Sequence, residues 1–266
     1  MKCVITCGGK GTRLLPFTKE LPKEMAPIFV NDNNLNLKPL LQLIFENMYE
    51  VGLRDFCFVT GKTSGSIQNH FCPESNLPSL SNFFQMIDNS KLFWINQPHP
   101  KGFGDAVLLS NSYVGQDFVI VHAGDVALYP NDLSIIKYLL SLENQDVDAA
   151  FLVREVKDPE RHGIISTNSA GDFLNVEKVV EKPLSPESNL GIFPIYLFKN
   201  EIFNAIKSIE PGYGGEIQLT DAIQKLINEG KKVVAIKISN NNILDVGTPE
   251  SYKDAIDLSY RFSKEI

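Results

Sequence analysis

The sequence predicts an α/β fold with a doubly wound, mainly parallel mixed sheet flanked by helices. Two observations support this class. Short, continuously apolar runs alternate in the first half of the chain with segments whose apolar residues recur at the helical period. A glycine-rich loop directly follows the first of these runs, Cys3–Cys7. Strands that are apolar throughout are buried on both faces, as in a parallel sheet covered by helices on each side.

The first half of the chain supplies most of the predicted parallel strands. These are Cys3–Cys7, Phe56–Thr60, Leu92–Asn96, Phe118–His122 and Ala149–Val153. The predicted helices are Pro39–Tyr49, Gly65–Phe71, Phe103–Tyr113 and Leu133–Leu142. Residues Cys72–Ser90, rich in Pro, Ser and Asn, are predicted to form an insertion with one short helix at about Leu80–Ile87. In such sheets ligands bind outside the carboxyl ends of the strands, which directs attention to the loops that follow them.

The second half is richer in strands. Those predicted are Gly163–Thr167, Phe173–Val180, Gly191–Phe198, Val233–Ile238 and Ile243–Asp245. The predicted helices are Glu201–Ile209, Leu219–Glu229 and a final helix from about Pro249. Gly230 is expected to cap the second of these, because glycine accepts the left-handed conformation that ends many helices.

Composition excludes several classes of function. The net charge of −7 over 266 residues offers no basic field for nucleic acid. No segment approaches the roughly 18 apolar residues of a membrane span, and no signal-peptide pattern precedes the first strand. The four cysteines show no metal-ligand spacing, and Cys3, Cys7 and Cys57 lie in predicted strands as buried thiols. We therefore expect a cytoplasmic protein with neither nucleic acid nor membrane as partner.

The loop after the first strand is the most informative feature of the chain. It reads Gly8-Gly9-Lys10-Gly11-Thr12-Arg13, and Lys19 and Lys23 follow. Three glycines in four residues let the backbone approach a ligand closely, and successive N–H groups form a concavity suited to anions. The arginine and lysines add full positive charge near it. The loop is therefore predicted to bind a polyphosphate.

Two other phosphate-binding motifs fail on their residues. A P-loop ending at Gly61-Lys62-Thr63 would need a glycine at position 56, which is Phe56. A dinucleotide-binding fingerprint starting at Gly9 would need its third glycine at position 14, which is Leu14. The failed fingerprint argues against a dehydrogenase, and absence of NAD(H) binding would exclude one.

Eight motifs, taken together and in order, make the chain resemble the sugar-phosphate nucleotidyltransferases, and among them the prokaryotic UTP–glucose-1-phosphate uridylyltransferases. They are GGKGTRLLPFTKELPKEM (Gly8–Met25), VTGK with a later HF (Val59–Lys62, His70-Phe71), QPHPKGFGDAV (Gln97–Val107), HAGDV (His122–Val126), RHGII (Arg161–Ile165), VEKP (Val180–Pro183), GGEIQLTDAI (Gly214–Ile223) and LDVGTPES (Leu244–Ser251). The resemblance implies one catalytic domain over residues 1–266 with a Rossmann-like, GT-A-like core. A nucleotide-binding half would span about 1–125, a sugar-phosphate half 126–248 and a C-terminal helix 249–266.

The reaction that the resemblance implies joins UTP and glucose 1-phosphate into UDP-glucose and pyrophosphate. Because the attacking phosphate oxygen is already an anion, the protein must mainly align two repelling anions and neutralise the leaving group. By resemblance, Asp125 and Asp245 hold Mg²⁺, and Arg13 and Lys23 bind the triphosphate. Lys182 would reach the phosphate of the sugar substrate, which makes Arg13, Lys23, Lys182 and Asp125 the candidate catalytic residues.

The same resemblance implies the remaining binding residues. Gly8, Gly9, Gly11 and Thr12 would line the nucleotide. Gln97 and the backbone at Gly102 would read the base, since a side-chain amide offers both a donor and an acceptor to uracil or thymine. On the sugar side, the expected residues are Gly163, Glu181 and Glu216.

Some residues depart from the family pattern. Asp105 stands where the uridylyltransferases usually have His, and its orientation decides whether its charge opposes the nucleotide. Met25-Ala26-Pro27 replaces the commoner Met-Leu-Pro, and the Cys72–Ser90 insertion is short and polar. These departures leave open UTP against dTTP, the sugar epimer and the size of the homo-oligomer, a dimer or a tetramer. The alternatives are a glucose-1-phosphate thymidylyltransferase and a non-catalytic relative that binds sugar nucleotides.

Overall fold

The computed structural model describes residues 1–32, 34–62, 65–74, 76–130 and 133–265. Two residues named in the sequence predictions lie outside these ranges: Thr63, from the rejected P-loop, and Ile266, the end of the predicted C-terminal helix.

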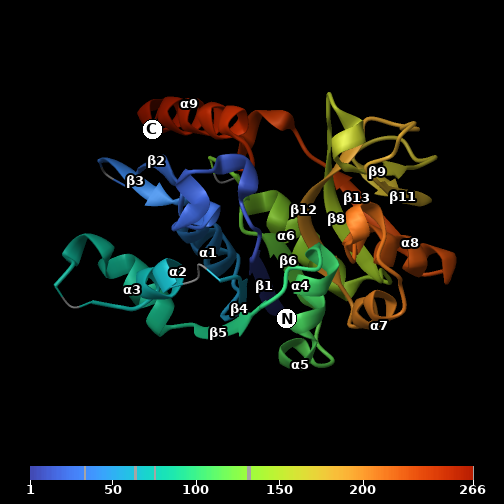
Figure 1. Cartoon of the computed structure of the whole chain (residues 1–266), viewed down its shortest axis with the longest axis horizontal. Helices are drawn as coiled ribbons and strands as arrows, with labels where there is room; N and C mark the ends of the chain where they lie inside the picture. The colour runs from blue at the N-terminus through green and yellow to red at the C-terminus, as the bar shows by residue number, and fades with distance from the viewer. Residues whose placement is uncertain (33, 63–64, 75, 131–132, 266) are drawn as a thin grey trace.

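A ten-stranded sheet forms the centre of the molecule (Figure 1). Its strands are β1 (Lys2–Cys7), β4 (Asp55–Thr60), β5 (Lys91–Asn96), β6 (Val119–Ala123), β8 (Ala149–Glu155), β9 (Gly163–Ser166), β10 (Phe173–Asn175), β11 (Lys178–Glu181), β12 (Leu190–Phe198) and β13 (Val233–Lys237). The main path runs β10-β13-β8-β12-β6-β1-β4-β5, while β9 pairs with β11 and β12. Strands β6, β1, β4 and β5 are parallel, and β12 runs antiparallel between β6 and β8. The predicted mixed, mainly parallel α/β class is confirmed.

Two small sheets accompany the central one, and three of their four strands were not predicted. They pair β2 (Pro27–Asn31) with β3 (Leu35–Pro39), and β7 (Val126–Leu128) with β14 (Ile243–Asp245). The β7–β14 pair matters for function because its register sets Asp245 opposite Val126. A residue near the end of the chain is thereby fixed beside the residue that follows Asp125.

Helices cover both faces of the sheet (Figure 1). Their bounds are α1 (Leu40–Glu50), α2 (Gly65–His70), α3 (Ser81–Asp88), α4 (Phe103–Leu109), α5 (Asn111–Val114), α6 (Leu133–Ser141), α7 (Glu201–Lys207), α8 (Leu219–Asn228) and α9 (Pro249–Glu265). Helices α1, α3 and α6 share one hydrophobic cluster with the sheet, and α4, α7 and α8 share another. Among the described helices, none is both long and apolar enough to cross a bilayer.

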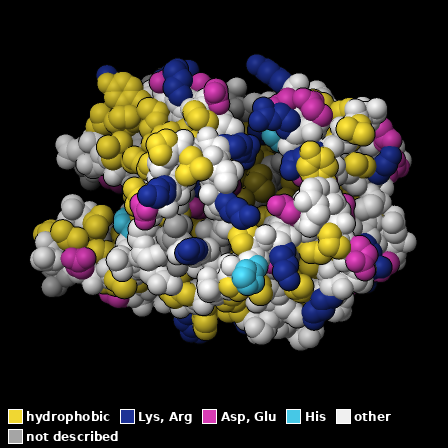
Figure 2. Space-filling model, viewed as in Figure 1, with side chains coloured by type: hydrophobic (Ala, Val, Ile, Leu, Met, Phe, Trp, Pro, Cys, Tyr) yellow, Lys and Arg dark blue, Asp and Glu magenta, His cyan; other side chains and the backbone are white. Residues whose placement is uncertain are grey.

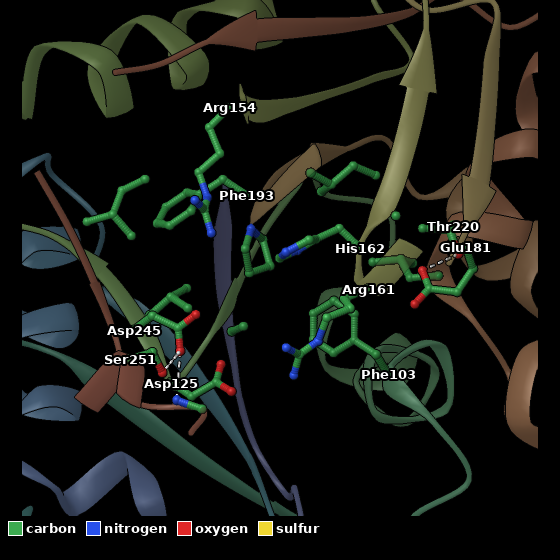
Figure 3. A pocket seen from close by; sticks show the side chains of 18 of the residues that line it. Phe103, Asp125, Arg154, Arg161, His162, Glu181, Phe193, Thr220, Asp245 and Ser251 are labelled. Carbon is green, nitrogen blue, oxygen red and sulfur yellow. Dashed lines mark hydrogen bonds between the residues drawn. The ribbon is translucent and has the colours of Figure 1, made fainter. Parts of the chain in front are cut away.

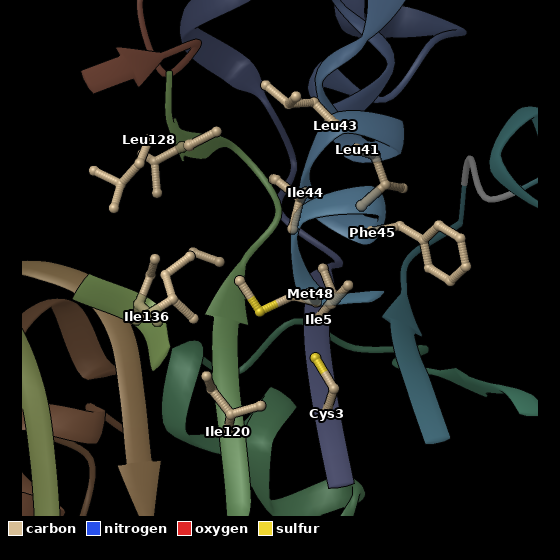
Figure 4. Close-up of a cluster of buried hydrophobic side chains, with 14 of the residues drawn as sticks. Cys3, Ile5, Leu41, Leu43, Ile44, Phe45, Met48, Ile120, Leu128 and Ile136 are labelled. Carbon is tan, nitrogen blue, oxygen red and sulfur yellow. The ribbon is translucent and has the colours of Figure 1, made fainter. Parts of the chain in front are cut away.

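The two clusters follow the alternation of side chains along each strand. In β1, Ile5 faces the α1 cluster and Val4 faces the opposite one, and both are fully buried. Figure 4 shows Ile5 close to Ile44 and Met48 of α1. Burial of one such side chain contributes roughly 1.5–3 kcal/mol. This double-sided burial explains why the strands read as continuous apolar runs.

Two predicted elements are divided in the structure. The expected helix Phe103–Tyr113 becomes α4 and α5 because the Ser110 hydroxyl donates to the Val107 carbonyl at 2.7 Å, a local bond that competes with helical pairing. The expected strand Phe173–Val180 becomes β10, which pairs with β13, and β11, which pairs with β9. One straight strand could not reach both partners.

Helix α9 ties the end of the chain to the unpredicted β2–β3 hairpin. The Tyr252 hydroxyl donates to the Pro27 carbonyl at 3.0 Å, and the Phe29 amide donates to the Ser259 hydroxyl at 3.2 Å. Figure 1 shows α9 lying along β2. Because α9 directly follows β14, this packing helps to hold Asp245 in place.

Candidate active site

Two adjoining cavities open at the carboxyl ends of β1 and β6. The first, the glycine-loop cavity, has a volume of about 360 Å³ and is lined by the loop after β1. The second, the Glu181 cavity, has a volume of about 460 Å³ and extends toward β11 and β12. Arg13, Phe103, Ala123, Asp125 and Gly247 line both. In Figure 2 the surface is hollowed near its centre, with Lys and Arg side chains around the hollow.

The glycine-loop cavity gathers all the residues expected to bind the nucleotide. Its lining contains Gly8, Gly9, Gly11, Thr12, Arg13, Lys23, Gln97, Gly102 and Glu216. Glu216, expected on the sugar side, thus lies in this cavity and is absent from the residues that line the other one.

Gly102 closes the cavity at the start of α4. Its φ of +117° is one that other residues rarely adopt, and a Cβ there would lie 2.5 Å from the Ile217 carbonyl oxygen. The neighbouring Gly104 amide donates to the same oxygen at 2.9 Å. The loop before α4 is therefore held against the segment that carries Glu216.

Asp105, whose orientation the sequence left open, contacts Gln97. The Gln97 side chain is only 3% exposed, and its Nε2 donates to Asp105 Oδ2 at 2.7 Å. The acidic residue therefore lies in the second layer behind the cavity, where it holds the amide expected to read the base.

Lys23 and Asp125 form an ion pair at the centre of the site. Burial would raise the pKa of Asp125, but the charge of Lys23 and its hydrogen bond outweigh burial and lower it. Burial likewise opposes the charge of Lys23, whereas Asp125 and Glu24 raise the pKa of the ammonium. Both groups are therefore charged at neutral pH.

Asp245 points from β14 into the Glu181 cavity, which Asp125 also lines (Figure 3). Its Oδ1 accepts hydrogen bonds from the Gly247 amide at 2.6 Å and from the Ser251 hydroxyl at 3.2 Å. The backbone adds a link, since the Val246 amide donates to the Asp125 carbonyl at 3.0 Å. The two aspartates expected to share a metal are thus brought to one cavity, with one oxygen of Asp245 held in place and the other available.

The donor set fits a hard divalent cation whose coordination is completed by substrate. Within the described ranges, no three His, Cys, Asp or Glu side chains are grouped to hold a metal. Mg²⁺ requires only one or two carboxylates when phosphate oxygens and water supply the rest. Asp125 and Asp245 can provide that pair.

The far end of the Glu181 cavity contains hydrogen-bonding groups suited to hydroxyls. Glu181 Oε2 accepts from the Thr220 hydroxyl at 3.1 Å (Figure 3). Gly163 lies beside both residues. Lys182 does not line either cavity; its Nζ lies 3.4 Å from Glu181 Oε1 and 4.8 Å from the centre of the Tyr213 ring. Lys182 has φ +43°, and such strained residues concentrate at functional sites.

The sequence model of the nucleotidyl transferase family matches residues 2–260. The chain belongs to this nucleotidyl transferase family. It is 34% identical to the UTP–glucose-1-phosphate uridylyltransferase of Pseudomonas aeruginosa over 97% of this chain and 95% of that protein. A solved structure of UDP-glucose pyrophosphorylase complexed with UDP-glucose superposes with a TM-score of 0.87 at 27% identity, covering 100% of this chain and 99% of the other. A UTP-bound UDP-glucose pyrophosphorylase from Acinetobacter baumannii superposes with a TM-score of 0.79 at 27% identity. The match covers 99% of this chain and 96% of the other.

This nucleotidyl transferase has further basic residues at the Glu181 cavity that the sequence analysis did not assign. Arg154, Arg161 and His162 line it, and Figure 3 shows Arg161 and His162 between the aspartate pair and Glu181, with Arg154 beside Phe193. Arg161 and His162 belong to the motif RHGII, from which the sequence predicted a role for Gly163 alone. The sequence gives one weak sign that Arg154 is functional: it is a charged residue that directly follows the predicted apolar strand Ala149–Val153.

Glu24 is another residue of this nucleotidyl transferase that the sequence analysis missed. Its side chain is buried beneath the glycine-loop cavity, and among the described residues its Oε2 has no hydrogen-bond partner. Burial raises its pKa to about 7, against the opposing charge of Lys23. In the sequence Glu24 stands beside Lys23 in a polar, basic segment, which gives no sign that its carboxyl group is buried.

Proposed function

We propose that the chain transfers a uridylyl group from UTP to glucose 1-phosphate, giving UDP-glucose and pyrophosphate with the help of Mg²⁺. One observation carries the proposal: the two cavities adjoin, and Arg13 and Asp125 line both of them. A nucleotide in the glycine-loop cavity and a sugar phosphate in the Glu181 cavity would meet there. The names of the P. aeruginosa relative and of the solved neighbours support this choice of substrates.

The nucleotide would lie with its phosphates against the glycine loop. Gly8, Gly9, Gly11 and Thr12 offer main-chain groups to it, and Arg13 and Lys23 would bind its β- and γ-phosphates. Mg²⁺ held by Asp125 and Asp245 would neutralise phosphate charge. Lys23 would then exchange its contact with Asp125 for the triphosphate.

The sugar phosphate would lie in the Glu181 cavity, with Glu181 and Gly163 toward the sugar and Lys182 toward its phosphate. Glu216 would contact the ligands from the nucleotide side. One phosphate oxygen forms the new bond to the α-phosphorus of UTP, and the bond from that phosphorus to the bridging oxygen breaks. The electron pair leaves with pyrophosphate, whose charge Arg13 and Lys23 stabilise.

We also propose a cytoplasmic homo-oligomer, a dimer or a tetramer. All four cysteines are free, with Cys3, Cys7 and Cys57 buried, which fits a reducing compartment. Exposed apolar side chains on β3 and α9 include Leu35, Leu37 and Tyr260, and Figure 2 shows a hydrophobic area on that side. Light scattering after gel filtration tests assembly, and a monomer at micromolar concentration would contradict it.

The decisive test of function is pyrophosphate release with Mg²⁺ from UTP, dTTP, CTP, GTP and ATP, each with glucose 1-phosphate and a panel of other sugar 1-phosphates. We expect rapid release from UTP with glucose 1-phosphate. A higher kcat/KM with dTTP would make the protein a thymidylyltransferase. No release from any pair, with UTP still bound, would make it a non-catalytic binding protein.

A further inference from the structure

We infer that Asp105 is a positioning residue that fixes which end of the Gln97 amide faces the nucleotide base, and that this orientation selects UTP over CTP. The inference rests on the proposed function, since it places the base beside Gln97. Asp105 itself lies behind Gln97 and is absent from the residues that line the glycine-loop cavity.

The contact between the two side chains determines the orientation of the amide. Asp105 Oδ2 lies 2.7 Å from the end of the Gln97 side chain. An ionised carboxylate only accepts hydrogen bonds, so the amide must present its NH₂ group to Asp105. The carbonyl oxygen, Oε1, must therefore point the other way.

The surroundings hold this arrangement rigid. The main-chain N–H of Gln97 donates to the Thr60 carbonyl at 2.8 Å. This bond extends the pairing of β4 and β5 by one residue. The side chain is 3% exposed and has little space to turn. Asp105 stands in the first turn of α4, whose start is fixed by the bond from Gly104 to Ile217.

Gly8 shows where Oε1 is directed. A Cβ built on Gly8 would lie 2.7 Å from Gln97 Oε1, so this oxygen faces the first glycine of the loop. Within the part of the chain that the structure describes, no protein group donates to Oε1. A buried amide therefore presents one free acceptor beside Gly8, in the glycine-loop cavity that both residues line.

A free acceptor distinguishes the pyrimidine bases. Uracil and thymine carry N3–H, a donor that can meet Oε1, whereas N3 of cytosine is an acceptor and would face Oε1 lone pair to lone pair. A site built to bond one hydrogen-bonding group strongly rejects an analogue that lacks it. The 5-methyl group plays no part in this contact, so Asp105 does not separate UTP from dTTP.

The Asp105→Asn variant tests the inference because asparagine keeps the shape but can donate as well as accept. Either orientation of the Gln97 amide then finds a partner, and the flipped one offers NH₂ to cytosine N3. We expect the ratio of kcat/KM for UTP to that for CTP to fall by about tenfold or more, the size of one net hydrogen bond. Asp105→Leu, which removes the partner altogether, should also lower this ratio.

A merely structural role for Asp105 would lower the rates with both nucleotides equally and leave their ratio unchanged. Asp88→Asn is the matched control, since it makes the same change at an exposed position on α3 and should leave the ratio alone. Ratios within twofold of wild type in both Asp105 variants would overturn the inference.

Equilibrium binding separates this inference from the proposed function. If the wild-type protein releases no pyrophosphate from any nucleotide, the proposed function fails. Calorimetric titration of the wild-type protein and the Asp105 variants with UTP and with CTP then still tests the role of Asp105 in nucleotide selection. A wild-type preference for UTP that shrinks in Asp105→Asn supports the inference, and equal affinities in the wild-type protein overturn it.

Discussion

The ammonium of Lys23 and the carboxylate of Asp125 meet across 102 positions of sequence. Their side chains are 13% and 23% exposed, so the pair is largely shielded from water. One residue follows the glycine loop and the other follows β6, so the pair joins the two parallel strands at their carboxyl ends. The group expected to bind triphosphate thus neutralises, in the free protein, the group expected to bind metal.

Asp125→Asn should lower kcat by at least about 100-fold, because a neutral amide neither holds Mg²⁺ nor balances Lys23. The free energy of unfolding should also fall by about 1–3 kcal/mol, since the shielded ammonium of Lys23 loses its hydrogen-bond acceptor. Initial rates over a Mg²⁺ titration and urea denaturation measure the two effects. Asp245→Asn should lower kcat by a similar factor, but it should lower the free energy of unfolding less than Asp125→Asn does. Asp245 accepts hydrogen bonds from Gly247 and Ser251 and, among the described residues, forms no ion pair with a lysine. Wild-type rates in both variants would remove the metal assignment.

Lys182→Ala should lower kcat/KM for glucose 1-phosphate by about 100-fold, because it removes the cation proposed for the substrate phosphate. Its stability should change little, since the partly exposed pair with Glu181 contributes at most about 1 kcal/mol. Lys178→Ala is the control: it lies on β11, the strand that ends directly before Lys182, and it pairs with Glu187 at the surface. An unchanged kcat/KM in Lys182→Ala would exclude the proposed role.

The strands and helices that carry the fold were predictable because each has a strong local pattern. Val4 and Ile5 are apolar in succession since both faces of β1 are covered, and this pattern is visible in the sequence. The β2–β3 hairpin and β7 were missed. Their short strands take their structure from partners far along the chain, such as Ser259 for β2 and Leu244 for β7.

The site was predictable where a motif carries it and unpredictable where tertiary contacts create it. Arg13, Lys23 and Asp125 come from such motifs and line the cavities, while their roles stay predictions. Neither the bond from Gln97 to Asp105 nor the burial of Glu24 could be found this way. A bond partner and a burial state depend on how α4 and the loop after β1 pack, which no local pattern records.

Gly8→Ala should raise the KM for UTP by about tenfold or more. The new methyl would lie 2.7 Å from Gln97 Oε1, and Asp105 leaves that side chain little freedom to move away. The loss should appear in nucleotide affinity, measured by calorimetry, with little change in thermal unfolding. Gly65→Ala is the control, since a Cβ there meets nothing within 4 Å. Wild-type affinity in Gly8→Ala would show that the Gln97 oxygen lies away from the base.

His122 should make the stability of the protein depend on pH in the mildly acidic range. It lies in β6 at the centre of the sheet with 2% of its surface exposed, and burial lowers its pKa to about 4, against the opposing effects of the Ala123 carbonyl and Asp125. Unfolding returns the group to its usual pKa of about 6.5, so the unfolded chain binds the proton more tightly. The stability that the neutral ring contributes is therefore complete above about pH 6.5 and is lost as pH falls toward 4.

The His122→Asn variant isolates this effect, because asparagine has no charge to gain. Between pH 7 and pH 5, the wild-type free energy of unfolding should fall by about 2 kcal/mol more than that of the variant, the equivalent of about 1.5 pH units. Urea denaturation at pH 7, 6 and 5 measures the difference. His99→Asn, at an exposed position, should keep the wild-type dependence. Parallel curves for wild type and His122→Asn would mean that His122 is protonated inside the folded protein, with the nearby Asp125 carboxylate offsetting the cost of burial.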